Sequence, residues 1–324
     1  MRKEAAHSKN SAYAAGTISN LHSQWKSYLM FCLYFGIQSF PASTDVLCLY
    51  AQFLSRSFKS ISAIRTYVAG VRTLHLFLNV MLPTSQQFFL NLTLKGISKR
   101  LKHVPLQKLP ITPDILSHML LHLDLSVELH LVFWTCCLFA FFLCARKSNL
   151  LPHSRNKLSQ NSYLLRSDVL RTTDSLVVCI KWSKTNQTNE EYLTIPLFKI
   201  KNSILCPVSA FNRMCHTVKA RSNNPMFMFH NDSGVLVPLS FNIFDKLLSS
   251  VLRVAGYNPY LYSGHSFRRG GATWAFANGF PSDAIKLLGD WKSDSFLLYI
   301  HLSFDTRVTL AKKFAKSISH IRVN

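Results

Sequence analysis

The stretch GHSFRRGGATWAFANGFPSDAIKLLGDWKSDSFLLY, residues 264–299, decides the fold of this chain and the chemistry expected of it. His265 and Arg268 are three residues apart, so on a helix they lie on one face. A guanidinium beside an imidazole suits a phosphodiester, because the arginine fork binds two non-bridging oxygens and histidine exchanges a proton near neutral pH. Tyr299 adds a hydroxyl that can serve as a nucleophile. The H-x-x-R spacing alone also fits a helix N-terminus with solvated charges.

Two glycines follow the arginine pair within what reads as one helix. In a helix interior, Gly270 and Gly271 each cost about 1 kcal/mol relative to alanine. A helix tolerates glycine where its backbone must approach another group closely. We therefore expect a close backbone contact at these two positions.

The chain is strongly basic and has enough apolar residues for real cores. Its 324 residues allow two domains of ordinary size, and 48% of them are hydrophobic. The formal charge is +22, from 37 Lys and Arg against 15 Asp and Glu, which favours a polyanionic partner such as nucleic acid. The eight cysteines form no C-x-x-C pair and lie mostly in apolar runs. They indicate reduced, buried thiols and neither a disulfide framework nor a zinc site.

One apolar run, LHLVFWTCCLFAFFLCA at 129–145, could be mistaken for a membrane span. Its uninterrupted part is shorter than the roughly 20 residues that a bilayer requires, and it ends at Arg146. A helix that is apolar all round more often lies at the centre of a large soluble domain. The polar N-terminus carries no signal-peptide pattern, so we expect an intracellular chain without membrane segments.

Three motifs of the C-terminal stretch resemble the signature of the tyrosine recombinases, the phage-integrase family. HSFRRGGAT, LLGDWKS and LLYIH follow the family order of H-x-x-R, then a His or Trp after a Gly, then the Tyr nucleophile. The residues of these motifs are most similar to those in recombinases of eukaryotic mobile elements of the DIRS, Ngaro and Crypton kinds. The family's spacing points to Asp290 for the His/Trp position, whereas the aromatic residue is Trp291. We favour Trp291, because an Asp would repel a phosphate and an indole N–H can donate to one.

The resemblance implies a small helical domain of the core-binding (SAM-like) type ahead of the catalytic domain, and residues 11–103 have a suitable pattern. Apolar residues recur at helical spacing and predict four helices, over 17–36, 45–57, 60–80 and 86–103. Basic side chains lie among them on the third and fourth helices. We predict that these contact DNA phosphates: Arg65, Arg72, Lys95, Lys99, Arg100 and Lys102. An ordinary solvated helix face would give the same pattern.

The segment VPLQKLPITP, residues 104–113, has three prolines and no periodicity, which predicts a linker. We therefore expect domains at 11–103 and 114–324, with Thr112 and Pro113 at the start of the first helix of the second domain. The expected fold class is mainly α. It consists of the four N-terminal helices followed by a helical catalytic domain with a small antiparallel β-sheet.

The segment CARKSNL, residues 144–150, resembles the family's first arginine motif, with Arg146 in the arginine position and Ser148 in the serine position. Cys144 stands where the family commonly has Gly, and Asn149 where it usually has an acid. A charged side chain that follows so apolar a helix needs an anionic partner if it is buried. A charge capping a helix C-terminus would look alike in the sequence.

Two stretches rich in β-branched and aromatic residues, SLVVCIKWS (175–183) and EYLTIPL (191–197), flank the turn-like KTNQTNE. This pattern predicts a β-hairpin. In the resembled family a lysine on this hairpin protonates the leaving 5′ oxygen. Lys184 matches that position best, and Lys181, on the strand, is a poorer match. A solvent-exposed lysine without a catalytic role would give the same sequence pattern.

The resemblance implies DNA cleavage and rejoining through a 3′-phosphotyrosyl bond, by chemistry like that of type IB topoisomerases. In the implied catalytic set, Tyr299 is the nucleophile and His265 helps to activate it. Arg146, Arg268 and Trp291 bind the phosphate, and Lys184 is the general acid. Acidic residues are scarce and form no two-metal cluster, so we expect no metal and no other cofactor. The implied partner is double-stranded DNA, bound by a homotetramer in the nucleus.

Two interpretations stay open. The first is an active site-specific recombinase or integrase, encoded by or derived from a mobile element, and the catalytic set favours it. The second is a decayed or domesticated recombinase that keeps the fold and only binds DNA. Asn149 and the lack of a His at 290 or 291 favour the second.

Overall fold

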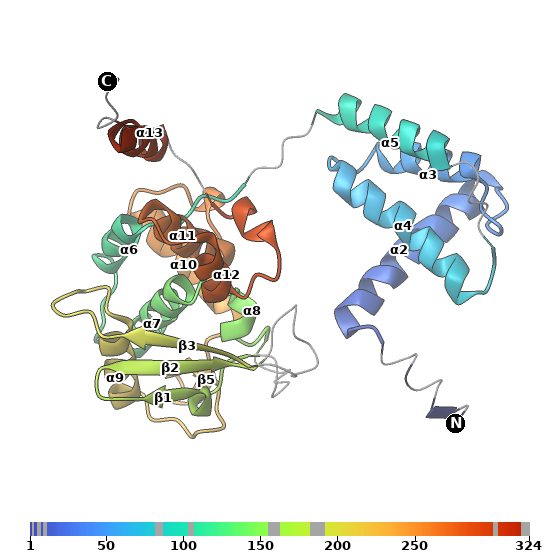
Figure 1. The fold of residues 1–324 in the computed structure, drawn as a ribbon. Helices are drawn as coiled ribbons and strands as arrows, with labels where there is room; N and C mark the ends of the chain where they lie inside the picture. Colours follow the sequence, from blue (N-terminus) through green and yellow to red (C-terminus); the bar gives the residue numbers. More distant parts are fainter. Residues whose placement is uncertain are drawn as a thin grey trace, which may run out of the picture. The chain divides into compact units, whose positions relative to one another are not determined.

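The computed structural model describes residues 1, 3–4, 8, 12–81, 87–102, 107–154, 163–181, 192–300 and 304–318. The chain divides into two compact units, Met1–Leu106 and Gln107–Asn324 (Figure 1). Helices dominate both units, and small antiparallel sheets occur in the second. The mainly α fold class expected from the sequence is confirmed.

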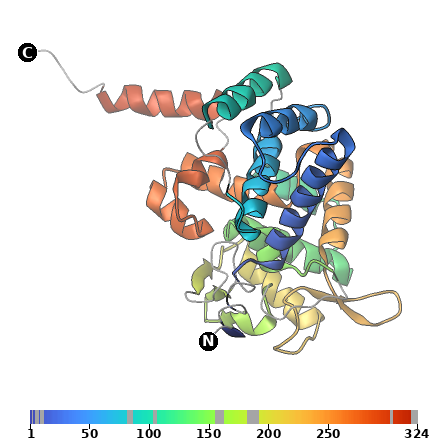
Figure 2. The ribbon, with the colours of Figure 1, turned by 90° about the vertical axis from the view of Figure 1, so that its right-hand side faces the viewer.

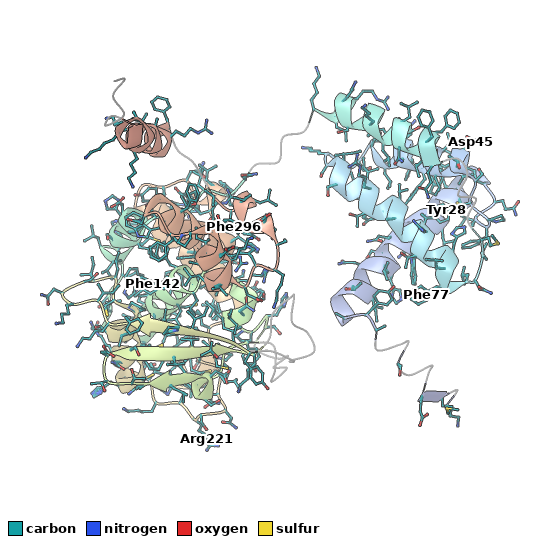
Figure 3. All side chains as sticks on the ribbon, in the orientation of Figure 1. Tyr28, Asp45, Phe77, Phe142, Arg221 and Phe296 are labelled. Carbon is teal, nitrogen blue, oxygen red and sulfur yellow. The ribbon has the colours of Figure 1, made fainter. Side chains whose placement is uncertain are left out.

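The core of the first unit is formed by the helices α2 (Ala15–Phe35), α3 (Thr44–Leu54), α4 (Ile61–Phe77) and α5 (Gln87–Leu101). Gly36 ends α2 in a left-handed conformation, and the Ser43 side chain starts α3 by accepting a hydrogen bond from the backbone N–H of Val46. Apolar side chains from all four helices share one core. Within it, the ring centroids of Tyr28 and Tyr50 lie 5.3 Å apart in an edge-to-face arrangement. Tyr28 is labelled in Figure 3.

The second unit is built around α7 (Glu128–Phe142), which is buried along most of its length. The helices α9 (Pro207–Thr217) and α11 (Gly264–Ala277) pack against it. The apolar run at 129–145 is therefore an interior helix, as predicted. Within the described ranges, no helix combines the length and the apolar character that crossing a membrane requires.

The helix α6 (Pro113–Leu120) begins where the sequence predicts. The Thr112 hydroxyl accepts a hydrogen bond from the backbone N–H of Ile115 at 3.3 Å, and Pro113 occupies the first helical position.

The strands β1 (Val169–Arg171), β2 (Ser175–Ile180) and β3 (Leu193–Phe198) form one antiparallel sheet in that order (Figure 1). β2 and β3 pair over their whole length, with Val178 opposite Ile195, so the predicted hairpin strands are present. A second, two-stranded sheet consists of β4 (Met228–His230) and β5 (Leu236–Pro238).

The C-terminal stretch follows α10 (Phe241–Val254) and folds into α11, α12 (Ser282–Gly289), the 3-10 helix η3 (Asp294–Leu298) and α13 (Phe304–Ile318). α11 and α12 lie side by side in both views (Figures 1 and 2). The sequence after DWKSD predicts a helix that carries Phe296, Tyr299 and Ile300. The 3-10 helix η3 carries Phe296, but the prediction is wrong for Tyr299 and Ile300, because η3 ends at Leu298.

Candidate active site

The helix α11 begins with a reciprocal cap that fixes the position of His265. The Ser263 hydroxyl accepts a hydrogen bond from the backbone N–H of His265 at 3.3 Å. In return, Ser266 Oγ accepts one from the backbone N–H of Ser263 at 3.0 Å. This capping box satisfies donors that the first turn would otherwise leave unpaired. It places His265 in the first turn of the helix, with Arg268 three residues further on.

The two glycines of α11 lie against backbone from two other segments. A Cβ atom at Gly270 would overlap the carbonyl oxygen of Ile111, and one at Gly271 would overlap the carbonyl oxygen of Phe141, near the end of α7. The backbone N–H of Ile111 also donates to the Ser266 carbonyl at 2.9 Å. The close backbone contact expected from the sequence is therefore present, and it locks α11 onto α7.

Arg268 is buried deeply, with 1% of its surface exposed. Its Nη1 donates to the carbonyl oxygen of Cys144, whereas Nε and Nη2 have no hydrogen-bond partner among the described residues. None of the ion pairs in the described part of the chain includes it. Burial and the nearby Arg146 lower the pKa of Arg268 to about 10, against an opposing effect of Tyr299, so it stays charged at neutral pH. A buried cation with two unused donors calls for an anionic ligand.

Two aromatic rings cover this guanidinium. The Cζ atom of Arg268 lies 3.7 Å from the centroid of the Trp291 ring and 5.2 Å from that of Tyr299. The two ring centroids are 5.4 Å apart. Trp291 is only 6% exposed, and its indole N–H has no hydrogen-bond partner among the described residues. The structure thus brings Arg268, Trp291 and Tyr299 together. Phe296, which is labelled in Figure 3, packs in the same cluster as the two rings.

The turn after α12 explains why Trp291 reaches the site. Asp290 adopts a left-handed conformation with φ 52°, and the backbone N–H of Trp291 donates to the Lys286 carbonyl at 3.0 Å. The indole ring then lies over Gly289, where a Cβ atom would overlap it. The sequence Gly-Asp-Trp is therefore a structural unit in which glycine leaves room for the ring.

Arg146 and Arg268 line the same small hollow, together with Asn149 and Asp290. Arg146 precedes the short helix α8 (Lys147–Leu150). The Asn149 side chain accepts a hydrogen bond from the backbone N–H of Arg146 at 3.1 Å, so it supports this arginine through the main chain. Asp290 shares the hollow, while Trp291 covers Arg268. Both candidates for the His/Trp position therefore border the site.

Cys144 precedes this loop in a backbone conformation that favours glycine. Its φ is 44°, in the left-handed region. This gives a physical reason for the glycine that the resembled motif commonly has there. The thiol is buried, and burial raises the pKa of Cys144 to about 12, so we assign it no chemical role.

His265 is exposed at the surface yet electrostatically coupled to both arginines. Partial desolvation, followed by the charges of Arg268, Arg146 and Lys147, lowers the pKa of His265 below its usual value. The imidazole is therefore neutral at physiological pH and able to accept a proton. Lys147 was not expected in this group from the sequence; its Nζ pairs with Asp245 Oδ2 at 2.6 Å.

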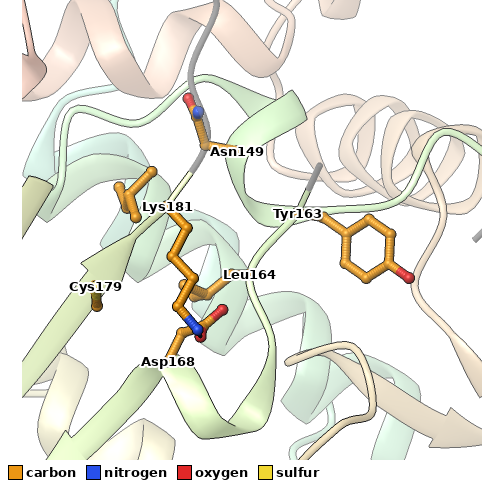
Figure 4. Close-up of a pocket in the computed structure, with 7 residues that line it drawn as sticks. Asn149, Tyr163, Leu164, Asp168, Cys179 and Lys181 are labelled. Atoms are coloured by element: carbon orange, nitrogen blue, oxygen red, sulfur yellow. Dashed lines mark ion pairs between the residues drawn. The ribbon is translucent and has the colours of Figure 1, made fainter. Parts of the chain in front are cut away.

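Of the two candidate hairpin lysines, the structure describes only Lys181. Lys184 lies outside the described residues. Lys181, directly after β2, forms an ion pair with the buried carboxylate of Asp168 (Figure 4). The hydrogen bond that Lys181 donates to Asp168 raises the pKa of Lys181. Asn149 borders the same small hollow as this pair.

The predicted DNA-contacting residues of the first unit are exposed basic side chains: Arg65 and Arg72 on α4, Lys95, Lys99 and Arg100 on α5, and Lys102 just after α5. Arg65 and Arg72 are seven residues apart and share a helix face. Arg100 also donates a hydrogen bond to the Gln52 side chain.

Sequence reasoning missed one further arginine. Arg269 donates hydrogen bonds to the carbonyl of Leu298 at 2.7 Å and to Gln107 Oε1 at 3.2 Å. The only trace of it in the sequence is the arginine doublet at 268–269. Within the described ranges, His, Cys, Asp and Glu side chains form no cluster of three or more that could hold a metal ion.

Solved structures resemble the chain along most of its length, although no protein-family model and no curated protein matches the sequence. A lambda integrase dimer bound to a COC′ core site is 15% identical with a TM-score of 0.58, over 93% of each chain. The integrase of the Tn1549 transposon, in complex with circular intermediate DNA, is 13% identical with a TM-score of 0.55, over 95% of this chain and 97% of that one. The XerH site-specific recombinase bound to its difH substrate is 13% identical with a TM-score of 0.54, over 85% and 71%.

Each match covers 85% or more of this chain, so it extends over both compact units. Identity is low throughout, so the likeness is one of backbone architecture. The chain therefore has the fold of the tyrosine recombinases and integrases.

Proposed function

We propose that this chain is a tyrosine recombinase, a site-specific enzyme that cuts and rejoins duplex DNA through a phosphotyrosyl intermediate. The observation that carries the proposal is the buried guanidinium of Arg268, which keeps two unused N–H donors. The Trp291 indole N–H is a third buried donor without a partner among the described residues. A phosphodiester supplies the acceptor oxygens and the negative charge that these donors need.

In the proposed reaction, the Tyr299 hydroxyl oxygen attacks the phosphorus of a DNA backbone phosphate. The bond to the 5′ oxygen breaks, and a 3′-phosphotyrosyl bond forms. Arg146 and Arg268 stabilise the negative charge of the pentavalent phosphate from the hollow that they share. The neutral His265 accepts the tyrosine proton, and Lys184 protonates the leaving oxygen. Because the new bond conserves the energy of the phosphodiester, a second 5′-hydroxyl can reverse the step without ATP.

We extend the proposal to the organisation of the protein. Residues 114–324 form the catalytic domain, and residues 11–103 contact the DNA through the exposed basic side chains of α4 and α5. The +22 charge supports a polyanionic partner. The wording of the GDWKSD motif supports an origin in a eukaryotic mobile element, with a homotetramer acting on DNA in the nucleus.

The test is a nicked suicide substrate that carries candidate ends of the mobile element, incubated with the full chain. We expect a covalent protein–DNA adduct that survives denaturation. Tyr299→Phe should abolish the adduct and leave DNA binding intact, because only the hydroxyl is removed. Mapping the tyrosyl peptide by mass spectrometry identifies the attacking residue.

A chain that binds the substrate tightly and forms no adduct would instead be a DNA-binding protein that retains the recombinase fold. An adduct that persists in Tyr299→Phe would show that a different residue attacks, and the assignment of the nucleophile would be wrong.

A further inference from the structure

The short helix that precedes Tyr299 is tied down at both ends by basic side chains. At its start, Lys286 of α12 pairs with Asp294 at 2.7 Å. At its end, Arg269 of α11 donates through Nη2 to the carbonyl oxygen of Leu298 at 2.7 Å. Leu298 is the residue directly before Tyr299. The backbone that carries the tyrosine is thus fixed by two helices that lie side by side.

Arg269 joins two segments that are far apart in the sequence. While Nη2 binds Leu298, Nη1 donates to Gln107 Oε1 at 3.2 Å. The rigid, planar guanidinium fork suits this bridge, because one ordered side chain serves two acceptors in fixed directions. Hydrogen bonds from a charged donor are also stronger than neutral ones. Burial lowers the pKa of Arg269, but an arginine remains charged at neutral pH.

A second contact from the same helix follows one turn later. Thr273 Oγ1 donates to the carbonyl oxygen of Tyr299 at 3.4 Å. Positions 269 and 273 are four residues apart, so they share one face of α11. Together they hold the carbonyl groups on both sides of the Tyr299 Cα atom. The helix that provides Arg268 therefore also fixes the backbone of the tyrosine.

We propose that Arg269 is a positioning residue, which sets the distance and orientation of the Tyr299 hydroxyl relative to the phosphate held by Arg268. The proposal rests on the proposed function of Tyr299 as nucleophile. Arg269 bonds to the main chain directly before the tyrosine, and its charge also acts on the Tyr299 side chain, whereas Arg268 lies under the rings of Trp291 and Tyr299. A displacement of the nucleophile by roughly 1 Å can slow a reaction by about 100-fold.

The experiment compares full-length Arg269→Gln with the unaltered chain on the nicked suicide substrate, at saturating DNA. We expect adduct formation to slow by roughly 100-fold with unchanged DNA affinity, because the tyrosine is misplaced and the phosphate ligands are intact. Arg269→Lys keeps the charge and one donor, and should recover part of the rate. Hydrogen exchange in the DNA-free protein gives a second readout, since the backbone N–H of Tyr299 donates to the Phe296 carbonyl at 2.8 Å. Exchange in residues 294–300 should accelerate in Arg269→Gln.

A matched control is Arg213→Gln on α9. Arg213 likewise donates to a backbone carbonyl, that of Leu125, at 3.0 Å. Its loss should leave both the adduct rate and the exchange of residues 294–300 unchanged.

Three results would overturn the inference. The first is an adduct rate and exchange pattern in Arg269→Gln equal to those of the unaltered chain. The second is a rate loss matched by an equal loss of DNA affinity, which would make Arg269 a DNA contact. The third is a slower adduct rate in Arg269→Gln without faster hydrogen exchange of residues 294–300.

If Arg269→Gln does not fold, the adduct rate and the hydrogen exchange are measured on Arg269→Lys. If the unaltered chain forms no adduct, the proposed function fails, and the exchange data still decide whether Arg269 holds this segment.

Discussion

The two units carry their positive charge in opposite ways. On α4 and α5 of the first unit, basic side chains such as Arg65, Lys95 and Lys99 are exposed to water. In the second unit Arg268 is buried beneath Trp291, and two of its donors are unused. Exposed cations attract a polyanion collectively and are screened by salt. The N–H donors of a buried cation have no water to bind, so they need an acceptor in one fixed position.

The largest effect should come from removing the buried charge. Arg268→Met should slow adduct formation by about 1,000-fold, on the scale of losing a single preorganised donor to a reacting oxyanion. The thermal unfolding midpoint should stay the same or rise, because an apolar side chain of similar volume avoids the cost of burying a charge. Adduct assays and calorimetry on one protein preparation measure both quantities.

The control for this variant is Arg253→Met on α10, where the arginine is exposed. It should change neither the adduct rate nor the unfolding midpoint appreciably. A large fall in the midpoint of Arg268→Met would mean that the buried charge stabilises the folded chain, and the contrast between the two units would be lost.

The next effect concerns pH. Because neighbouring charges and desolvation lower the pKa of His265, the neutral imidazole persists below the usual histidine range near 6.5. At DNA concentrations well below saturation, where the rate reports the free protein, adduct formation should therefore hold level from mildly alkaline pH down to about 6.5 and fall as the pH drops through the lowered pKa. In the same window the unfolded chain binds more protons than the folded one, so His265 also makes folding less stable as the pH falls below about 6.5.

The matched variant for the pH experiment is His265→Gln. It should lower the plateau by roughly 100-fold and remove this acid limb, because glutamine does not titrate. An acid limb that survives in His265→Gln would assign the titration to another group.

The smallest effects should come from the exposed charges. Lys95→Gln and Lys99→Gln should each weaken DNA binding a few-fold and reduce the slope of log affinity against log salt by about 0.9, if each contacts one phosphate. The adduct rate at saturating DNA should not change. Titrations at several salt concentrations test this, and an unchanged salt slope would mean that the side chain faces solvent in the complex.

Local signals made much of the fold predictable. Gly36 marked the end of α2, Thr112 and Pro113 marked the start of α6, and β-branched runs marked β2 and β3, because each of these depends on a few neighbouring residues. The strands β1 and β5 have three residues each, too few to show alternation, so the sequence did not reveal them.

The site was predictable as a set of residue types, whereas its geometry was not. The H-x-x-R spacing placed His265 and Arg268 on one helix. The stacking of Arg268 on Trp291 and the bridge from Arg269 to Leu298 depend on how α11, α12 and η3 pack. The same packing explains the wrong prediction for Tyr299: Arg269 engages the Leu298 carbonyl, which an extended helix would need for its own ladder.

The burial of the Arg268 guanidinium beneath Trp291 also affects which substitutions this position can accept. Most substitutions that survive drift are those that do not lower stability past a threshold, and an apolar replacement of Arg268 would pass that filter easily. Under the proposed function, a copy that no longer needs to bind a phosphate at this site could therefore lose the arginine at position 268 while its scaffold persists.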